Sequence, residues 1–139
     1  MIYRPKHFKL TELVDPDIYA ARGDRAWELL QPAILVALDD LRAAFGPVVV
    51  NNWADGGPYK ESGLRTFTTK TGAPYSMHRF GGAMDCKIGI PSAEAVDYIV
   101  KHRLRFPTIT TMERPEATPT WLHIDCRNHG RDDIWIVNP

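Results

Sequence analysis

Two stretches of alternating side chains decide the fold, Ala83-Met84-Asp85-Cys86-Lys87-Ile88 and Trp121-Leu122-His123-Ile124-Asp125-Cys126. Successive side chains of a strand point to opposite faces of a sheet, so each stretch is typical of a strand with one polar and one apolar face. If the two strands are neighbours, Asp85 and His123 point to the same place, and both cysteines point into the core.

Helices are predicted around these strands from the spacing of apolar residues and from their end signals. Asp24 and Ser92 are the expected N-terminal caps of the first and third helices, and Gly46 is expected to end the second helix. Pro32 either kinks the first helix or begins a new one. The predicted helices cover residues 24–30, 34–45 and 92–102.

Further strands are predicted from β-branched and alternating runs. Residues 8–12 alternate like a short strand or lead-in, and Asp15-Pro16 opens a turn or short helix. The thirty residues before Ala83 are rich in Gly, Pro, Thr and Ser and indicate a long, functional loop. The last three strands are expected to form an antiparallel meander, which makes the domain α+β. The predicted strands cover residues 48–50, 83–90, 107–113, 120–127 and 134–137.

Length and composition narrow the class of protein. The 139 residues fit one domain, 1–139, with one core. Seventeen basic and seventeen acidic side chains leave no basic excess, so we expect no nucleic-acid partner. The first residues lack the apolar region of a secretory signal, and no apolar stretch approaches the roughly 20 residues of a membrane span. We therefore expect a monomer that is cytoplasmic as synthesised, with no membrane insertion.

The residues around the first strand predict a metal site. His78 lies in the long loop and Asp85 follows it by seven residues, while Gly81 and Gly82 permit a sharp turn between them. Together with His123 they offer two imidazoles and one carboxylate, the ligands of a catalytic Zn²⁺ site with an open fourth position. Iron or nickel would accept the same ligands. Two cysteines are too few for a cysteine zinc site or a disulfide framework.

These residues also carry a resemblance to a known family, the zinc D-alanyl-D-alanine carboxypeptidases. The family includes vancomycin-resistance dipeptidases and phage L-alanyl-D-glutamate endolysins, and it is similar to hedgehog signalling domains in the metal site. The matching motif is Ser76-x-His78-x-x-Gly81-x-Ala83-x-Asp85 followed by Trp121-x-His123. The resemblance extends to Ser62-Gly63-Leu64-Arg65, which is similar to the family's Ser-Gly-Tyr-Arg, and to an opening Phe8-x-Leu10-x-Glu12.

The resemblance implies a fold and an activity. The implied fold is a central antiparallel sheet with helices packed on one face and a zinc cleft on the other. The implied activity is zinc-dependent hydrolysis of peptidoglycan stem peptides, as a DD-carboxypeptidase or an endopeptidase similar to phage endolysins. Arg65 and Ser76 would hold the substrate or stabilise developing negative charge. Such a protein would reach the cell wall after release from the cell or as part of a phage virion.

One departure from the family concerns the general base. Many members carry a glutamate three residues before the second zinc histidine, where this chain has Thr120. Trp121-x-His123-x-Asp125 resembles a subgroup with an aspartate after the histidine. Asp125 is therefore the first candidate for the base, although it could instead only orient His123. Glu113 and Glu116 are the other candidates.

Thr120 also favours a different class of function. Without a base, the chain would be a catalytically inactive zinc-bearing structural or binding domain, such as a virion or tail component. A third interpretation is a metal-dependent amidase, or a peptidase unconnected with cell walls, that uses the same site.

Overall fold

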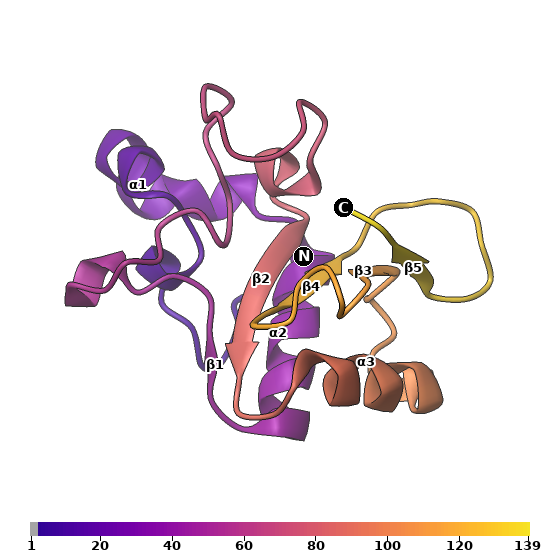
Figure 1. The fold of residues 1–139 in the computed structure, drawn as a ribbon. Coiled ribbons are helices and arrows are strands. Elements are labelled where there is room, and N and C mark those ends of the chain that lie inside the picture. The colour runs from indigo at the N-terminus through magenta and orange to yellow at the C-terminus, as the bar shows by residue number, and fades with distance from the viewer. Residues whose placement is uncertain (1–2) are drawn as a thin grey trace.

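A five-stranded sheet forms the centre of the protein in the computed structural model, which describes residues 3–139 (Figure 1). The strands follow one another across the sheet in the order β1-β2-β4-β3-β5. Their bounds are β1 Val48–Val49, β2 Ala83–Ile88, β3 Thr111–Glu113, β4 Leu122–Asp125 and β5 Trp135–Val137. Sheet and helices together give the α+β class that the order of elements predicted.

The sheet is mixed rather than antiparallel, which corrects one prediction. The pairs β1–β2, β2–β4 and β3–β4 are antiparallel, but β3–β5 is parallel, with Thr111 opposite Trp135. A meander would have placed β5 beside β4. Both edges of β4 are already taken by β2 and β3, so residues 126–134 cross past β3 at the same end of the sheet, and the last strand pairs with the free edge of β3.

Three α-helices are present in the described chain: α1 Pro16–Arg22, α2 Pro32–Phe45 and α3 Ser92–Lys101. Asp15 caps α1 by accepting a hydrogen bond from the Asp17 amide at 2.8 Å, as the expected Asp15-Pro16 turn or short helix requires. Pro32 begins α2, and Gly46 ends it with a positive φ of 78°. The predicted second helix and its stop signal are thus confirmed.

Three local predictions were wrong. Residues 10–12 form a 3-10 turn instead of a strand, closed by the Glu12 carboxylate on the Lys9 amide. Asp24 lies inside the 3-10 helix Gly23–Leu29 and caps nothing. Ser92 is the first residue of α3, and its hydroxyl donates to the Pro119 carbonyl instead of capping the helix.

The core lies between α2 and one face of the sheet, behind the strands in Figure 1. Helical spacing and strand alternation bring their apolar residues together, and all are at most 2% exposed: Ile34, Leu35, Leu38, Leu41, Met84, Met112, Leu122 and Ile124. Each such side chain stabilises the fold by about 1.5–3 kcal/mol relative to an exposed one. Cys86 belongs to this core, whereas Cys126 is only partly buried, and both are free thiols. None of the helices within residues 3–139 has the length and hydrophobicity that a membrane span needs.

Candidate metal centre

Strand pairing places the first two predicted ligands side by side. In the antiparallel register of β2 and β4, Asp85 is directly opposite His123. Their side chains leave the sheet on the face away from α2, and Nδ1 of His123 lies 2.8 Å from Oδ1 of Asp85. The two strands are therefore neighbours, and the predicted consequence, that Asp85 and His123 point to the same place, is confirmed.

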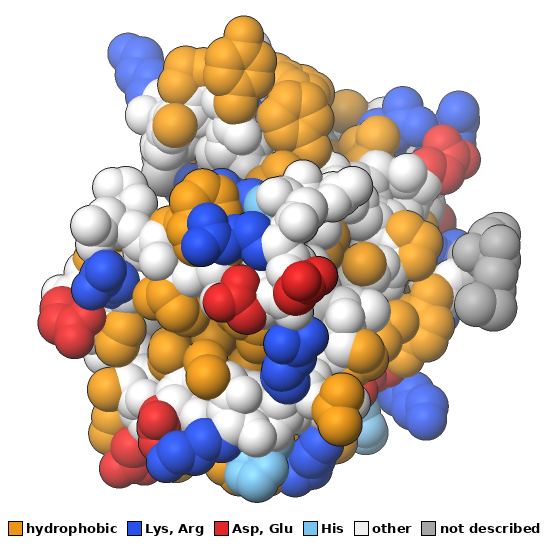
Figure 2. Space-filling view, turned by 90° about the vertical axis from the view of Figure 1, so that its right-hand side faces the viewer, with side chains coloured by type: hydrophobic (Ala, Val, Ile, Leu, Met, Phe, Trp, Pro, Cys, Tyr) orange, Lys and Arg blue, Asp and Glu red, His pale blue; other side chains and the backbone are white. Residues whose placement is uncertain are grey.

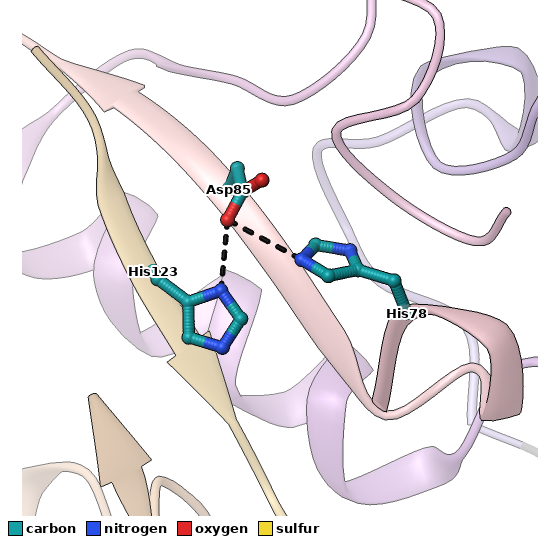
Figure 3. A group of neighbouring side chains, drawn as sticks. All are labelled: His78, Asp85 and His123. Atoms are coloured by element: carbon teal, nitrogen blue, oxygen red, sulfur yellow. Dashed lines mark hydrogen bonds and ion pairs between the residues drawn. The ribbon is translucent and has the colours of Figure 1, made fainter. Parts of the chain in front are cut away.

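A tight turn brings in the third ligand, His78. It lies in the 3-10 helix Met77–Phe80, which Ser76 caps by accepting from the His78 amide. The helix ends at Gly81, whose φ is 68° and where a Cβ would lie 1.9 Å from the Leu29 carbonyl oxygen, so only glycine fits. The chain then reverses into β2, and Nε2 of His78 lies 3.3 Å from Oδ1 of Asp85 (Figure 3).

Each imidazole is fixed by a hydrogen bond from its other nitrogen. Nδ1 of His78 donates to the Gly63 carbonyl at 2.9 Å, so Nε2 is the nitrogen that faces Asp85. Nε2 of His123 donates to Oδ2 of Asp125 at 3.2 Å, so Nδ1 is the nitrogen that faces Asp85. A histidine that binds a metal almost always donates its second ring nitrogen to a carbonyl or carboxylate in this way.

The donor atoms fit one metal ion. One nitrogen from each imidazole and one Asp85 oxygen all lie within 4.8 Å of one another. Two ligand atoms of a tetrahedral zinc ion, each about 2.0–2.1 Å from the metal, are about 3.3 Å apart. The His78–Asp85 separation already has this value, and the His123–Asp85 separation of 2.8 Å would have to open by about half an ångström. These three residues could therefore hold a metal ion.

The charges of the site are strongly coupled. Burial alone would raise the pKa of Asp85, but hydrogen bonds from His123 and His78 hold that pKa well below its usual range. Burial would lower the pKa of His123, but hydrogen bonds to Asp125 and Asp85 outweigh it and raise the pKa to about 9. The ligand carboxylate is thus kept ionised among its partners, the form that binds a cation.

Asp85, His78 and His123 lie at a cleft of about 750 Å³. Arg65 and Ser76, the predicted substrate-binding residues, also line it. Arg65 is buried, and its Nη2 donates to Oδ2 of Asp85 at 3.1 Å. Three aromatic side chains also line the cleft: Tyr75, Trp121 and Trp135. Figure 2 shows the side of the molecule on the right of Figure 1, where charged side chains of both signs lie below projecting hydrophobic rings.

The candidate bases occupy different surroundings. Asp125 is fully buried, is bonded to His123 and Arg127, and is not among the residues that line the cleft. Glu113 lines the cleft, and its Oε1 lies 3.8 Å from Nδ1 of His123. Glu116 and Thr120 are exposed and do not line it. The geometry thus favours an orienting role for Asp125 and places Glu113 at the cleft, on the side of His123 that faces Asp85.

Sequence reasoning missed one residue that contacts the site, and it could not place Glu113 relative to the ligands. Arg127 lies two residues beyond Asp125 and binds its carboxylate, a pairing that strand alternation continued past Asp125 would have suggested. Glu113 continues the register of β3, in which Thr111 faces Asp125 and Met112 faces Ile124, so the next step faces His123. The pairing of β3 with β4 was not available from the local pattern.

A scan against protein-family models, a search of curated proteins and a search of solved structures each found no match to this chain. Function is therefore inferred from the residues of the site and from the motif resemblance.

Proposed function

We propose that this protein is a zinc-dependent peptidase that hydrolyses peptidoglycan stem peptides, as a carboxypeptidase or an endopeptidase. The observation that carries the proposal is the convergence of His78, Asp85 and His123 at one cleft, each imidazole oriented by a second hydrogen bond. The motif resemblance supplies the substrate class. It also implies action on the cell wall, after release from the cell or from a phage virion.

Zinc at this site would supply a Lewis acid for the scissile carbonyl and an acidified water as nucleophile. Glu113 is the residue we assign as general base. Its carboxylate faces the ligands from the end of β3 and has no hydrogen-bond partner among the described residues, so it is free to accept a proton. A positioned general base typically contributes a factor of 10²–10⁴ to the rate.

Arg65 and Ser76 are assigned to the substrate side of the cleft. Arg65 anchors Oδ2 of Asp85, which turns Oδ1 toward both imidazoles. Arg65 also lines the cleft, where a guanidinium would stabilise negative charge that develops on a substrate oxygen. The Ser76 oxygen accepts from the His78 amide, so its own O–H remains free to donate to a bound peptide.

The second candidate is a zinc-bearing binding domain without hydrolase activity. The observation in its favour is Thr120, which stands where the family carries its glutamate and which is exposed outside the cleft. The two candidates share the metal site and differ in whether Glu113 can replace the missing glutamate.

Metal content by mass spectrometry, paired with digestion of purified murein and chromatography of the fragments, tests the proposal. We expect about one zinc per chain and released stem-peptide fragments, whose masses identify the bond that is cut. His78→Ala should lose both the zinc and the cleavage. His7→Ala, which removes an exposed histidine outside the cleft, is the matched control and should retain both.

The other outcomes are equally informative. Zinc without cleavage of murein would support the binding domain, with Thr120 as the reason. Cleavage of unrelated peptides in preference to murein would indicate a peptidase unconnected with cell walls. Activity that persists in His78→Ala would contradict the metal-dependent mechanism.

A further inference from the structure

A chain of three polar side chains leads from the surface to the back of the metal centre. Arg127 binds Asp125, and Asp125 accepts from Nε2 of His123, whose Nδ1 faces the other ligands. We propose that Arg127 is a positioning residue of the metal centre: by fixing the Asp125 carboxylate, it holds His123 with Nδ1 presented to the ion. This inference rests on the proposed metal site.

Arg127 engages the carboxylate at both oxygens. Its Nε donates to Oδ1 at 2.9 Å and to Oδ2 at 3.0 Å, its Nη2 donates to Oδ2, and its backbone N–H donates to Oδ1 at 3.1 Å. Forked guanidinium–carboxylate contacts add geometric specificity as well as energy. The carboxylate therefore has one orientation, in which Oδ2 also accepts from His123.

The rest of Asp125 cannot supply this orientation. Its backbone lies in the middle of the sheet, opposite Ala83 on β2 and Thr111 on β3, so the main chain is already held on both sides. What remains free is rotation of the side chain. Asp125 is fully buried, so protein groups orient its carboxylate: His123 and the backbone and side chain of Arg127. The guanidinium of Arg127 makes most of these hydrogen bonds, and we therefore assign it the orientation of the carboxylate.

Arg127 lies outside the apolar core, so substituting it tests the inference without disturbing core packing. About a third of its side chain is exposed, so a substitution there leaves no cavity in the apolar core. Arg114 is a suitable control, because it is an exposed arginine that lines the same cleft and has no hydrogen bond to Asp125. Comparing the two separates the loss of a positive charge at the cleft from the loss of the contact with Asp125.

The experiment measures Zn²⁺ affinity by competition with a chromophoric chelator for the full chain and four variants: Arg127→Gln, Asp125→Asn, the double variant and Arg114→Gln. Loss of a partner that orients a metal ligand typically costs 10–100-fold in affinity. We expect Arg127→Gln to weaken Zn²⁺ binding by about 10-fold or more and Arg114→Gln to leave it unchanged. In the double variant, Arg127→Gln should add little to Asp125→Asn, because it acts through that carboxylate.

A spectroscopic readout covers the case in which Asp125→Asn fails to fold. The visible absorption of the Co²⁺-loaded protein reports ligand geometry, and it should change in Arg127→Gln, change less in Arg127→Lys and stay the same in Arg114→Gln. Equal Zn²⁺ affinities and equal Co²⁺ spectra for Arg127→Gln and Arg114→Gln would overturn the inference. So would an effect of Arg127→Gln that is equally large in the Asp125→Asn background.

These outcomes are distinguishable from failure of the proposed function. A wild-type chain that binds no metal would refute the metal site and this inference with it. A wild-type chain that binds zinc, loses affinity on Arg127→Gln and cleaves no murein would support the positioning role while removing the peptidase activity.

Discussion

On one face of the β2–β4 pair, Met84 and Ile124 are covered by α2, whereas on the other face Asp85 and His123 open into a cleft. The two faces belong to the same six-residue and four-residue strands and differ only by alternation. The apolar face stabilises the fold through its buried area, which many side chains of similar volume can supply. The polar face can bind a metal ion only if each donor atom has the right position and protonation.

Adjacent residues of one strand therefore have different roles: one stabilises the core, and the next lies at the candidate metal centre. A change on the core face should alter the free energy of unfolding and leave the metal centre of the folded molecule intact. A change on the cleft face should alter metal binding or turnover and leave the core in place. Removal of the metal and substitutions on each face test this separation.

Removal of the metal should abolish hydrolysis of stem peptides and leave the fold in place, because the core lies on the face that holds no ligand. Dialysis against a chelator, followed by murein digestion and near-ultraviolet circular dichroism, measures both. A ligand present at about 1,000 times its Kd stabilises by roughly 4 kcal/mol, so the metal-free protein should also melt earlier. One equivalent of Zn²⁺ should restore activity. Hydrolysis that continues after the zinc content has fallen to background would contradict the mechanism.

Glu113→Gln should lower kcat by about 10²–10⁴-fold with zinc content unchanged, because the amide keeps the shape of the side chain but cannot accept the proton. Steady-state hydrolysis of a stem peptide, together with metal analysis, measures the two quantities. Glu116→Gln is the control, since Glu116 is exposed and does not line the cleft. A loss of turnover in Glu116→Gln and not in Glu113→Gln would reverse the assignment of the base.

Leu122→Ala should lower the free energy of unfolding by about 2–5 kcal/mol, because it leaves a cavity in the apolar core. The Zn²⁺ affinity of the folded fraction should not change, although the next residue along the strand is the ligand His123. Urea unfolding and chelator competition measure these effects. Leu122→Met, which conserves volume, should cost less than about 1.5 kcal/mol. A large loss of Zn²⁺ affinity in either variant would show that the two faces are not independent.

Glu61→Gln is expected to have the smallest effect. Hydrogen bonds from the hydroxyls of Thr69 and Thr71 lower the pKa of Glu61 and close the loop that forms one wall of the cleft. Because the folded pKa lies below the unfolded value of about 4.3, the carboxylate stabilises the fold above that pH, and the contribution is lost as the pH falls through the folded pKa. We expect a loss of about 1 kcal/mol or less at pH 7 and a smaller one at pH 3.

Urea midpoints for wild type and Glu61→Gln at the two pH values provide the measurement. Glu116→Gln, at an exposed residue in the turn after β3, is the matched control and should show no such dependence on pH. A Glu61→Gln effect as large at pH 3 as at pH 7 would mean that the charge of the carboxylate contributes nothing to closing the loop.

Part of the site was predictable because it depends on local periodicity. Alternation along 83–88 and 121–126 placed Asp85 and His123 on one face, and the Gly81-Gly82 pair indicated the turn that brings in His78. The structure brings these three together, and their ability to hold a metal ion follows from its distances. The identity of the metal, the activity and the substrate remain predictions that rest on the motif resemblance.

Other features could not be predicted from the sequence, because they depend on how segments far apart in the chain pair with one another. The parallel pairing of β5 depends on which strand edges are already occupied, and the approach of Glu113 to His123 depends on the register between β3 and β4. Asp125 shares a face with His123, as alternation requires, but its complete burial by neighbouring elements is not a property of its own strand.

By itself, the sequence determined which side chains are available and which side of its own strand each one takes, because a strand reverses its side chains at every residue whatever it packs against. It thereby determined that Asp85 and His123 share one face with the polar side chains and that the face opposite is apolar. Only the tertiary structure decided the order of the strands and which further carboxylate reaches the cleft. Those depend on pairing between segments far apart in the chain, where the deciding energies are contacts that no local pattern contains.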